Sequence, residues 1–194
     1  MTAFDTLLQK YRDISFSERD KGYRFERLMQ IFLKTYRHYD NEFRDVWLWP
    51  EFPSRKDFSG KDTGIDLVIR TKFGGYWAVQ CKCYKADARI DKPAVDTFLS
   101  TSGKTFFDVD EPGKKVSFEY RLWIDTTLNG FNQEAENTIQ GQTPPVGKLG
   151  YYDLVQAPVD WAKFDKGISG EGAAAKKHSP MPHQQMAIDQ VHNY

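Results

Sequence analysis

The chain has 194 residues, of which 40% are hydrophobic and 15% aromatic, a size and composition that bury one compact core rather than two. Lysine plus arginine and aspartate plus glutamate number 27 each, so the protein as a whole exerts no electrostatic pull on nucleic acid. Any contact with DNA must therefore come from a local basic patch or be arranged by another domain.

The cysteines and the pattern of apolar residues indicate the cellular compartment of the protein. Cys81 and Cys83 are too close along one strand face to form a disulfide with each other without distortion. The N-terminus lacks the pattern of a signal peptide, and no 18 apolar residues run together. We therefore expect a cytoplasmic protein without a disulfide framework and without membrane association.

Two helices are predicted at the start of the chain. Apolar residues from Phe4 to Tyr11 recur at helical spacing and predict a helix over 3–12. Overlapping Ser-x-x-acid patterns at Ser15 and Ser17 mark the start of a second helix, whose apolar stripe extends from Phe25 to Tyr36. Glu26 lies about 100° around the helix from Phe25, at the margin of that stripe. Taken alone it is an ordinary solvated glutamate.

A polar stretch follows the first predicted strand, 45–50. Residues 54–62 carry Arg55, Lys56 and Lys61 immediately before the next strand. Such a loop either holds a DNA backbone close to the chemistry or is an ordinary solvated loop.

Residues 62–82 place unusual polarity inside an apolar hairpin. Asp66 lies in an apolar run, and 73–75, Phe-Gly-Gly, supply the turn to a second strand, 77–84. Alternation along that strand puts Gln80 and Lys82 on one face and Cys81 on the other. Burying a polar side chain without a partner costs on the order of several kcal/mol. These residues therefore need a partner, a metal or a substrate. A structural ion pair between Asp66 and Lys82 is the simplest alternative.

The remaining elements alternate between helix and strand. We expect a helix over 91–102, a strand over 119–126, a helix over 131–140, a strand over 151–155 and a short helix over 158–164. Together with the hairpin, this order predicts an α/β fold in which helices flank a mixed β-sheet.

The composition changes near the C-terminus. Residues 1–165 are predicted to form one domain, 166–180 a Gly- and Ala-rich linker, and 181–194 a helix that starts a further, truncated domain. The alternative for 181–194 is a C-terminal helix that folds back on the domain.

Asp66, thirteen intervening residues, and then Gln80-x-Lys82 resemble the PD-(D/E)XK nuclease signature in its Mrr-like form. Residues 22–26, Gly-Tyr-Arg-Phe-Glu, resemble the start of the helix that carries a site glutamate in that family. The resemblance implies a restriction-endonuclease-like fold and catalytic residues Asp66, Gln80, Lys82 and Glu26. It also implies Mg²⁺ as cofactor, bound by Asp66, Gln80, Glu26 and the backbone carbonyl of Cys81.

This donor set suits phosphodiester hydrolysis, because a hard divalent cation with oxygen ligands can activate water and neutralise charge at phosphorus. Lys82 can either deprotonate the water or stabilise the developing negative charge, and the sequence leaves both roles open. An amide at position 80 binds Mg²⁺ less well than a carboxylate, so the expected metal affinity is low.

Gln184-x-x-Ala187-Ile188 resembles the Q motif that opens superfamily 2 helicase motors. A nuclease followed by a helicase resembles Type ISP (single-polypeptide Type I-like) restriction-modification enzymes. That order implies double-stranded DNA as substrate, and helicase and methyltransferase domains of the same polypeptide as partners. Two other hypotheses remain: a non-catalytic module that positions DNA, and a standalone modification-dependent nuclease, which the charge balance disfavours.

Overall fold

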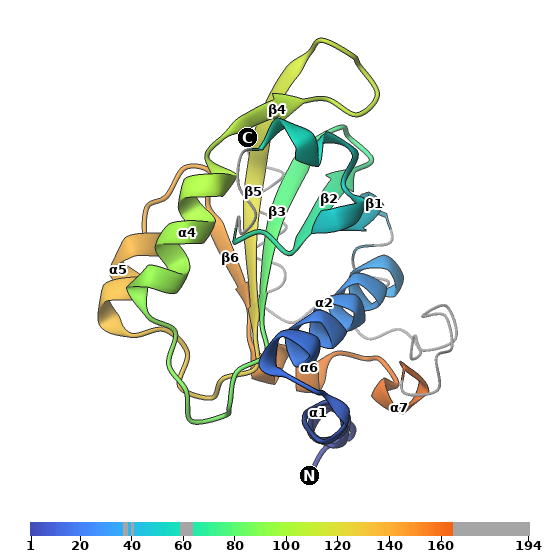
Figure 1. Ribbon diagram of the computed structural model, residues 1–194, viewed down its shortest axis with the longest axis vertical. Coiled ribbons are helices and arrows are strands. Elements are labelled where there is room, and N and C mark those ends of the chain that lie inside the picture. The colour runs from blue at the N-terminus through green and yellow to red at the C-terminus, as the bar shows by residue number, and fades with distance from the viewer. Residues whose placement is uncertain (37–38, 40, 59–63, 165–194) are drawn as a thin grey trace.

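A computed structural model describes residues 1–36, 39, 41–58 and 64–164 (Figure 1). Its helices are α1 (Ala3–Ile14), α2 (Glu18–Thr35), α4 (Lys92–Ser102), α5 (Gln133–Ile139), α6 (Tyr151–Gln156) and α7 (Trp161–Phe164), with short 3-10 helices η1 (Trp49–Glu51) and η2 (Pro53–Asp57). Its strands are β1 (Phe43–Leu48), β2 (Leu67–Thr71), β3 (Tyr76–Lys82), β4 (Thr105–Phe107), β5 (Lys115–Asp125) and β6 (Val146–Leu149). Lys61, the predicted linker and the predicted helix over 181–194 lie outside the described residues.

The strands form a six-stranded mixed sheet in the order β1-β2-β3-β5-β4, with β6 also paired to β5. The β1–β2–β3 meander is antiparallel, whereas β3 and β5 are parallel and bring Gln80 level with Trp123 and Lys82 level with Asp125. β3 is buried up to Lys82, and β5 is buried over its second half, from Tyr120 to Asp125. The predicted α/β class, a mixed sheet flanked by helices, is confirmed.

Helices cover both faces of the sheet, and each face has its own apolar core. Residues of α1, α2, α6 and α7 pack on one face against side chains such as Val79 and Leu122. Residues of α4 and α5 pack on the other face, beside an aromatic cluster under the 3-10 helices. Figure 1 shows α4 and α5 on one side of the sheet and α2 crossing near its lower end. None of the described helices is long and apolar enough to cross a membrane.

The predicted hairpin forms as expected. Thr71 N–H donates to Gly75 O across the turn at 2.8 Å, and Gly74 adopts a φ of +91°, a conformation that favours glycine. Ser17, in the second of the predicted capping patterns, accepts a hydrogen bond from Asp20 N–H. Asp91, at the start of the helix expected over 91–102, accepts one from Ala94 N–H.

The predicted strand over 151–155 is wrong. These residues form α6, because Gly150 acts as the N-cap and its N–H donates to the Asp153 carboxylate at 2.9 Å. Tyr151 faces α1 and donates a hydrogen bond to Asp5. The strand that pairs with β5 there is β6, which ends just before Gly150.

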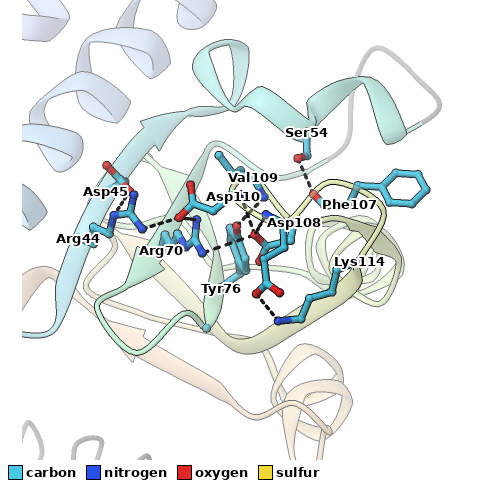
Figure 2. Close-up of polar contacts among 12 residues, drawn as sticks. Arg44, Asp45, Ser54, Arg70, Tyr76, Phe107, Asp108, Val109, Asp110 and Lys114 are labelled. Carbon is cyan, nitrogen blue, oxygen red and sulfur yellow. Dashed lines mark hydrogen bonds and ion pairs between the residues drawn. The ribbon is translucent and has the colours of Figure 1, made fainter.

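A charged cluster fixes the loop between β4 and β5 to the end of the sheet opposite Lys82 (Figure 2). Arg70, at the end of β2, is buried and contacts Asp110 at 2.6 Å and Asp108 at 3.5 Å. Tyr76 accepts a hydrogen bond from Val109 N–H in the same loop. The Arg70 guanidinium also lies 5.2 Å from the centre of the Tyr76 ring, so this end of the sheet is held by paired charges.

Candidate active site

The β2–β3 hairpin brings Asp66 and Gln80 into direct contact. The Gln80 amide nitrogen and the Cys81 backbone N–H both donate to the same oxygen of Asp66, the latter at 2.7 Å. Asp66 is itself part of the ladder, since its N–H donates to Val79 O and its carbonyl accepts from Trp49 N–H. The backbone of two neighbouring strands therefore fixes the position of this carboxylate.

Gln80 is almost completely buried, with 1% of its surface exposed. Its Nε2 lies 3.4 Å from the backbone carbonyl oxygen of Cys81 as well as next to Asp66. Its Oε1 is buried and has no hydrogen-bond partner among the described residues. An amide group thus occupies the space between the two oxygens expected to bind a metal, and it has a spare acceptor that a cation would satisfy.

Glu26 reaches the same place from α2. Burial raises the pKa of the Glu26 carboxyl to about 7, and the negative charge of Asp66 raises it further, against the opposing effect of Lys82. Because α2 packs against β3, Glu26 is near enough to Asp66 and Lys82 for their charges to act on it. A second carboxyl group is therefore available, and its burial favours the protonated form over the charged one.

Lys82 ends β3 on the same strand face as Gln80. Its side chain is partly exposed and forms no ion pair with any described residue. The alternative of a structural ion pair with Asp66 is not what the structure contains. The ammonium group is free to meet a substrate.

The donor set fits a hard divalent cation. Asp66 and Glu26 supply carboxylates, Gln80 an amide oxygen, and Cys81 a backbone carbonyl, all oxygen ligands of the kind Mg²⁺ prefers. Among the described residues no three His, Cys, Asp or Glu side chains gather as a metal-binding group, so this set depends on the amide and the backbone. The thiols do not compete, because burial, together with the charge of Asp66, keeps the pKa of Cys81 high.

The two described cations of the predicted DNA loop, Arg55 and Lys56, lie away from this site. Arg55 and Lys56 are exposed on η2, whose Ser54 donates a hydrogen bond to Phe107 O in β4. Phe106 lies opposite Val116, and Gln80 opposite Trp123. At about 3.3 Å per residue these levels of β5 are on the order of 20 Å apart. The structure thus brings Asp66, Gln80, Lys82 and Glu26 together, and leaves Arg55 and Lys56 outside the cluster.

Sequence reasoning missed one cation near the site. Arg19 is exposed on α2, and its charge lowers the pKa of Glu26. The two residues are seven positions apart, a separation that places them about 20° apart around a helix. That spacing was the available signal.

Comparison with known proteins identifies a family for most of the chain. The family model Mrr_cat_2, described as a restriction endonuclease, matches residues 34–171, a range that includes Asp66, Gln80 and Lys82 and begins after Glu26. No curated protein sequence matches the chain.

Two solved structures share the fold. One is the ATP-dependent Type ISP restriction-modification enzyme LlaBIII bound to DNA, with TM-score 0.65 and 23% identity over 100% of this chain. The other is the MspJI restriction endonuclease in complex with a 27-mer oligonucleotide, with TM-score 0.50 and 17% identity over 96% of this chain. The chain spans 11% of the length of the first and 39% of the second.

Proposed function

Because the chain belongs to the restriction endonuclease family whose model matches residues 34–171, we propose that it is a Mg²⁺-dependent domain that hydrolyses phosphodiester bonds of double-stranded DNA. The observation that carries this proposal is the contact between Asp66 and Gln80. An acid fixed by two strand backbones faces a buried amide with an unused oxygen.

The proposed metal ligands are Asp66, Gln80 through Oε1, the carbonyl of Cys81 and Glu26. When bound, Mg²⁺ would lower the pKa of a water molecule and neutralise charge on the scissile phosphate. Asp66 requires no rearrangement for this role, because the Cys81 N–H already orients it. Gln80 must turn its amide so that the oxygen, rather than the nitrogen, faces Asp66.

Lys82 has no ion-pair partner among the described residues, which leaves its ammonium group available to the reaction. In the proposed role it binds the phosphate oxygen on which negative charge develops, or orients the attacking water. Both roles need the group at the end of β3, where it lies near Glu26 and Asp66.

We further propose that the domain cuts DNA supplied by a helicase of the same polypeptide, with residues 166–180 as linker and 181–194 as the start of the next domain. Two observations support this. The net charge is zero, so sequence-independent affinity for phosphates is low. The fold also matches a small part of a much longer Type ISP enzyme chain.

A second candidate function is a non-catalytic module that positions DNA. The Gln80 amide favours it, because a neutral ligand weakens the metal site and its N–H groups already satisfy Asp66.

A plasmid-cleavage assay tests the proposal. The wild-type chain is expected to nick or cut supercoiled plasmid with Mg²⁺ and not with EDTA, whereas Asp66→Ala and Lys82→Ala are expected to leave it intact. Lys104→Ala is a matched control, since Lys104 is an exposed cation beyond the end of α4. Cleavage by Asp66→Ala or Lys82→Ala at the wild-type rate would refute the site assignment.

A further inference from the structure

The outer side of α2 carries aromatic and basic side chains next to the candidate site. We define the α2 stripe as Phe16, Arg19, Tyr23 and Arg27. At about 100° per residue, Arg19, Tyr23 and Arg27 lie within roughly 80° of one another around the helix, and Glu26 borders them. The stripe therefore lies along α2 beside Glu26 of the candidate site.

Phe16 is presented to solvent by an ordered backbone. Its side chain is 96% exposed, although its N–H donates to the Asp20 carboxylate at 3.2 Å and the next residue, Ser17, caps α2. A single exposed aromatic residue is common on protein surfaces. Here, however, the ring stands at the start of a row of cations, and nothing in the described structure covers it.

Arg19 is the unpaired cation of this row. Within residues 18–27, all described, Lys21 pairs with Glu18 at 2.5 Å, Arg24 with Asp20 at 3.1 Å, and Arg27 approaches Glu51 at 4.0 Å. Arg19 has no carboxylate oxygen within 4.0 Å among the described residues. A phosphate would give this guanidinium the bidentate partner that it lacks.

Tyr23 and Arg27 support each other. The Arg27 guanidinium donates to the Tyr23 hydroxyl at 3.1 Å and lies 5.7 Å from the centre of its ring. The ring thereby orients a second guanidinium on the same side of α2, beyond Arg19 as seen from Phe16. One oriented guanidinium, one unpaired guanidinium and one exposed ring are groups of the kind that binds a single nucleic acid strand.

From these contacts we infer that the α2 stripe binds an unpaired stretch of the DNA strand beside the scissile phosphate. Arg19 and Arg27 contact its phosphates, and Phe16 stacks on a base. An unpaired stretch is required because a duplex keeps its bases stacked within the helix, where the exposed ring cannot reach their faces. This inference rests on the proposed function, since it assigns a substrate contact to the same site.

The test measures how tightly the whole 194-residue chain binds a short labelled oligonucleotide in the absence of metal. The oligonucleotide is used as a single strand and as a duplex, and binding is followed by fluorescence anisotropy over a series of KCl concentrations. EDTA prevents cleavage, so the outcome does not depend on whether the domain cuts DNA. The variants are Phe16→Ala and Arg19→Gln, with Lys104→Gln as a control that removes one charge elsewhere on the surface.

Phe16→Ala is expected to weaken single-strand binding by about five-fold or more, as for the loss of one base–aromatic stack, with an unchanged salt slope. Arg19→Gln is expected to make the plot of log K against log salt less steep by about 0.7, as for one lost phosphate contact. Lys104→Gln should change neither, and the duplex should be insensitive to Phe16→Ala.

The inference is overturned if wild-type chain fails to bind the single strand at the lowest salt, or if both variants bind it as the wild type does. It is also overturned if Lys104→Gln weakens binding as much as Arg19→Gln, or if Phe16→Ala weakens duplex binding equally. Loss of cleavage in the plasmid assay with normal stripe binding would instead count against the proposed function alone.

Discussion

The Asp66 carboxylate is tied to the backbone of Cys81, whose N–H donates to Oδ2 at 2.7 Å across the β2–β3 hairpin. Because Asp66 precedes β2 and Cys81 belongs to β3, the sheet itself aims the acid. The acid is therefore preorganised before any ligand binds. Its removal should affect chemistry more than folding.

Asp66→Asn tests this separation. The amide keeps an oxygen for the Cys81 N–H but loses the charge, so Mn²⁺ binding and DNA cleavage should fall below detection while the melting temperature stays within about 3 °C of wild type. Calorimetric titration with Mn²⁺ and thermal unfolding provide the two readouts. Wild-type Mn²⁺ affinity in this variant would mean that the metal lies elsewhere.

Gln80→Glu should strengthen metal binding by about ten-fold or more, because a carboxylate replaces a neutral ligand. Without metal the same variant should be less stable, since a buried acid then faces Asp66. Thermal unfolding with and without Mn²⁺ should therefore show a larger metal-induced rise in melting temperature than in wild type. An equal rise in both proteins would exclude Gln80 as a ligand.

Glu26→Gln should flatten the pH dependence of stability. The pKa of Glu26 is raised from 4.5 to about 7 in the folded protein, so the folded state binds the proton more tightly than the unfolded state. Relative to Glu26→Gln, the unfolding free energy of metal-free wild type should fall as pH rises from about 4.5 to 7, by well under about 3 kcal/mol because solvent screens the partly exposed carboxyl group. Urea denaturation at several pH values measures the unfolding free energies of both proteins. The same pH dependence in the two proteins would contradict the placement of Glu26.

Asp108→Ala serves as a structural comparison far from the site. It leaves the partly exposed Asp110 as the one carboxylate paired with the buried Arg70 among the described residues, and should cost about 3 kcal/mol of stability. Urea unfolding measures this loss. Mn²⁺ affinity at a temperature where the variant is folded should match wild type, and a parallel loss of metal binding would show that the two ends of the sheet are coupled.

Local patterns in the sequence predicted most of the fold. Cap residues such as Ser17 and Asp91, and the Gly74 turn, act through neighbours a few positions away, so their signal is readable along the chain. The stretch 151–155 was misjudged because its apolar and aromatic residues suit a strand equally well. The helix is capped by a single hydrogen bond, from Gly150 N–H to the Asp153 carboxylate.

The site was predicted by residue type but not by geometry. Asp66, Gln80 and Lys82 could be grouped because they flank one hairpin, whereas the orientation of the Gln80 amide follows from burial on the sheet. The distance of Arg55 from the site depends on the path of η2 towards β4, which strand pairing sets and no local pattern encodes. The seven-residue spacing between Arg19 and Glu26 is readable in the sequence, but the exposure of Arg19 and its lack of a carboxylate partner among the described residues come from the structure.

Metal binding at Asp66 is tested most directly by the anomalous scattering of Mn²⁺ in crystals grown with DNA at millimolar Mn²⁺. We expect a peak bound by Asp66, Gln80 Oε1 and the carbonyl of Cys81, with the Gln80 amide turned from its present orientation. Absence of a peak beside Asp66 under these conditions would contradict a metal-dependent nuclease and support the module that only positions DNA.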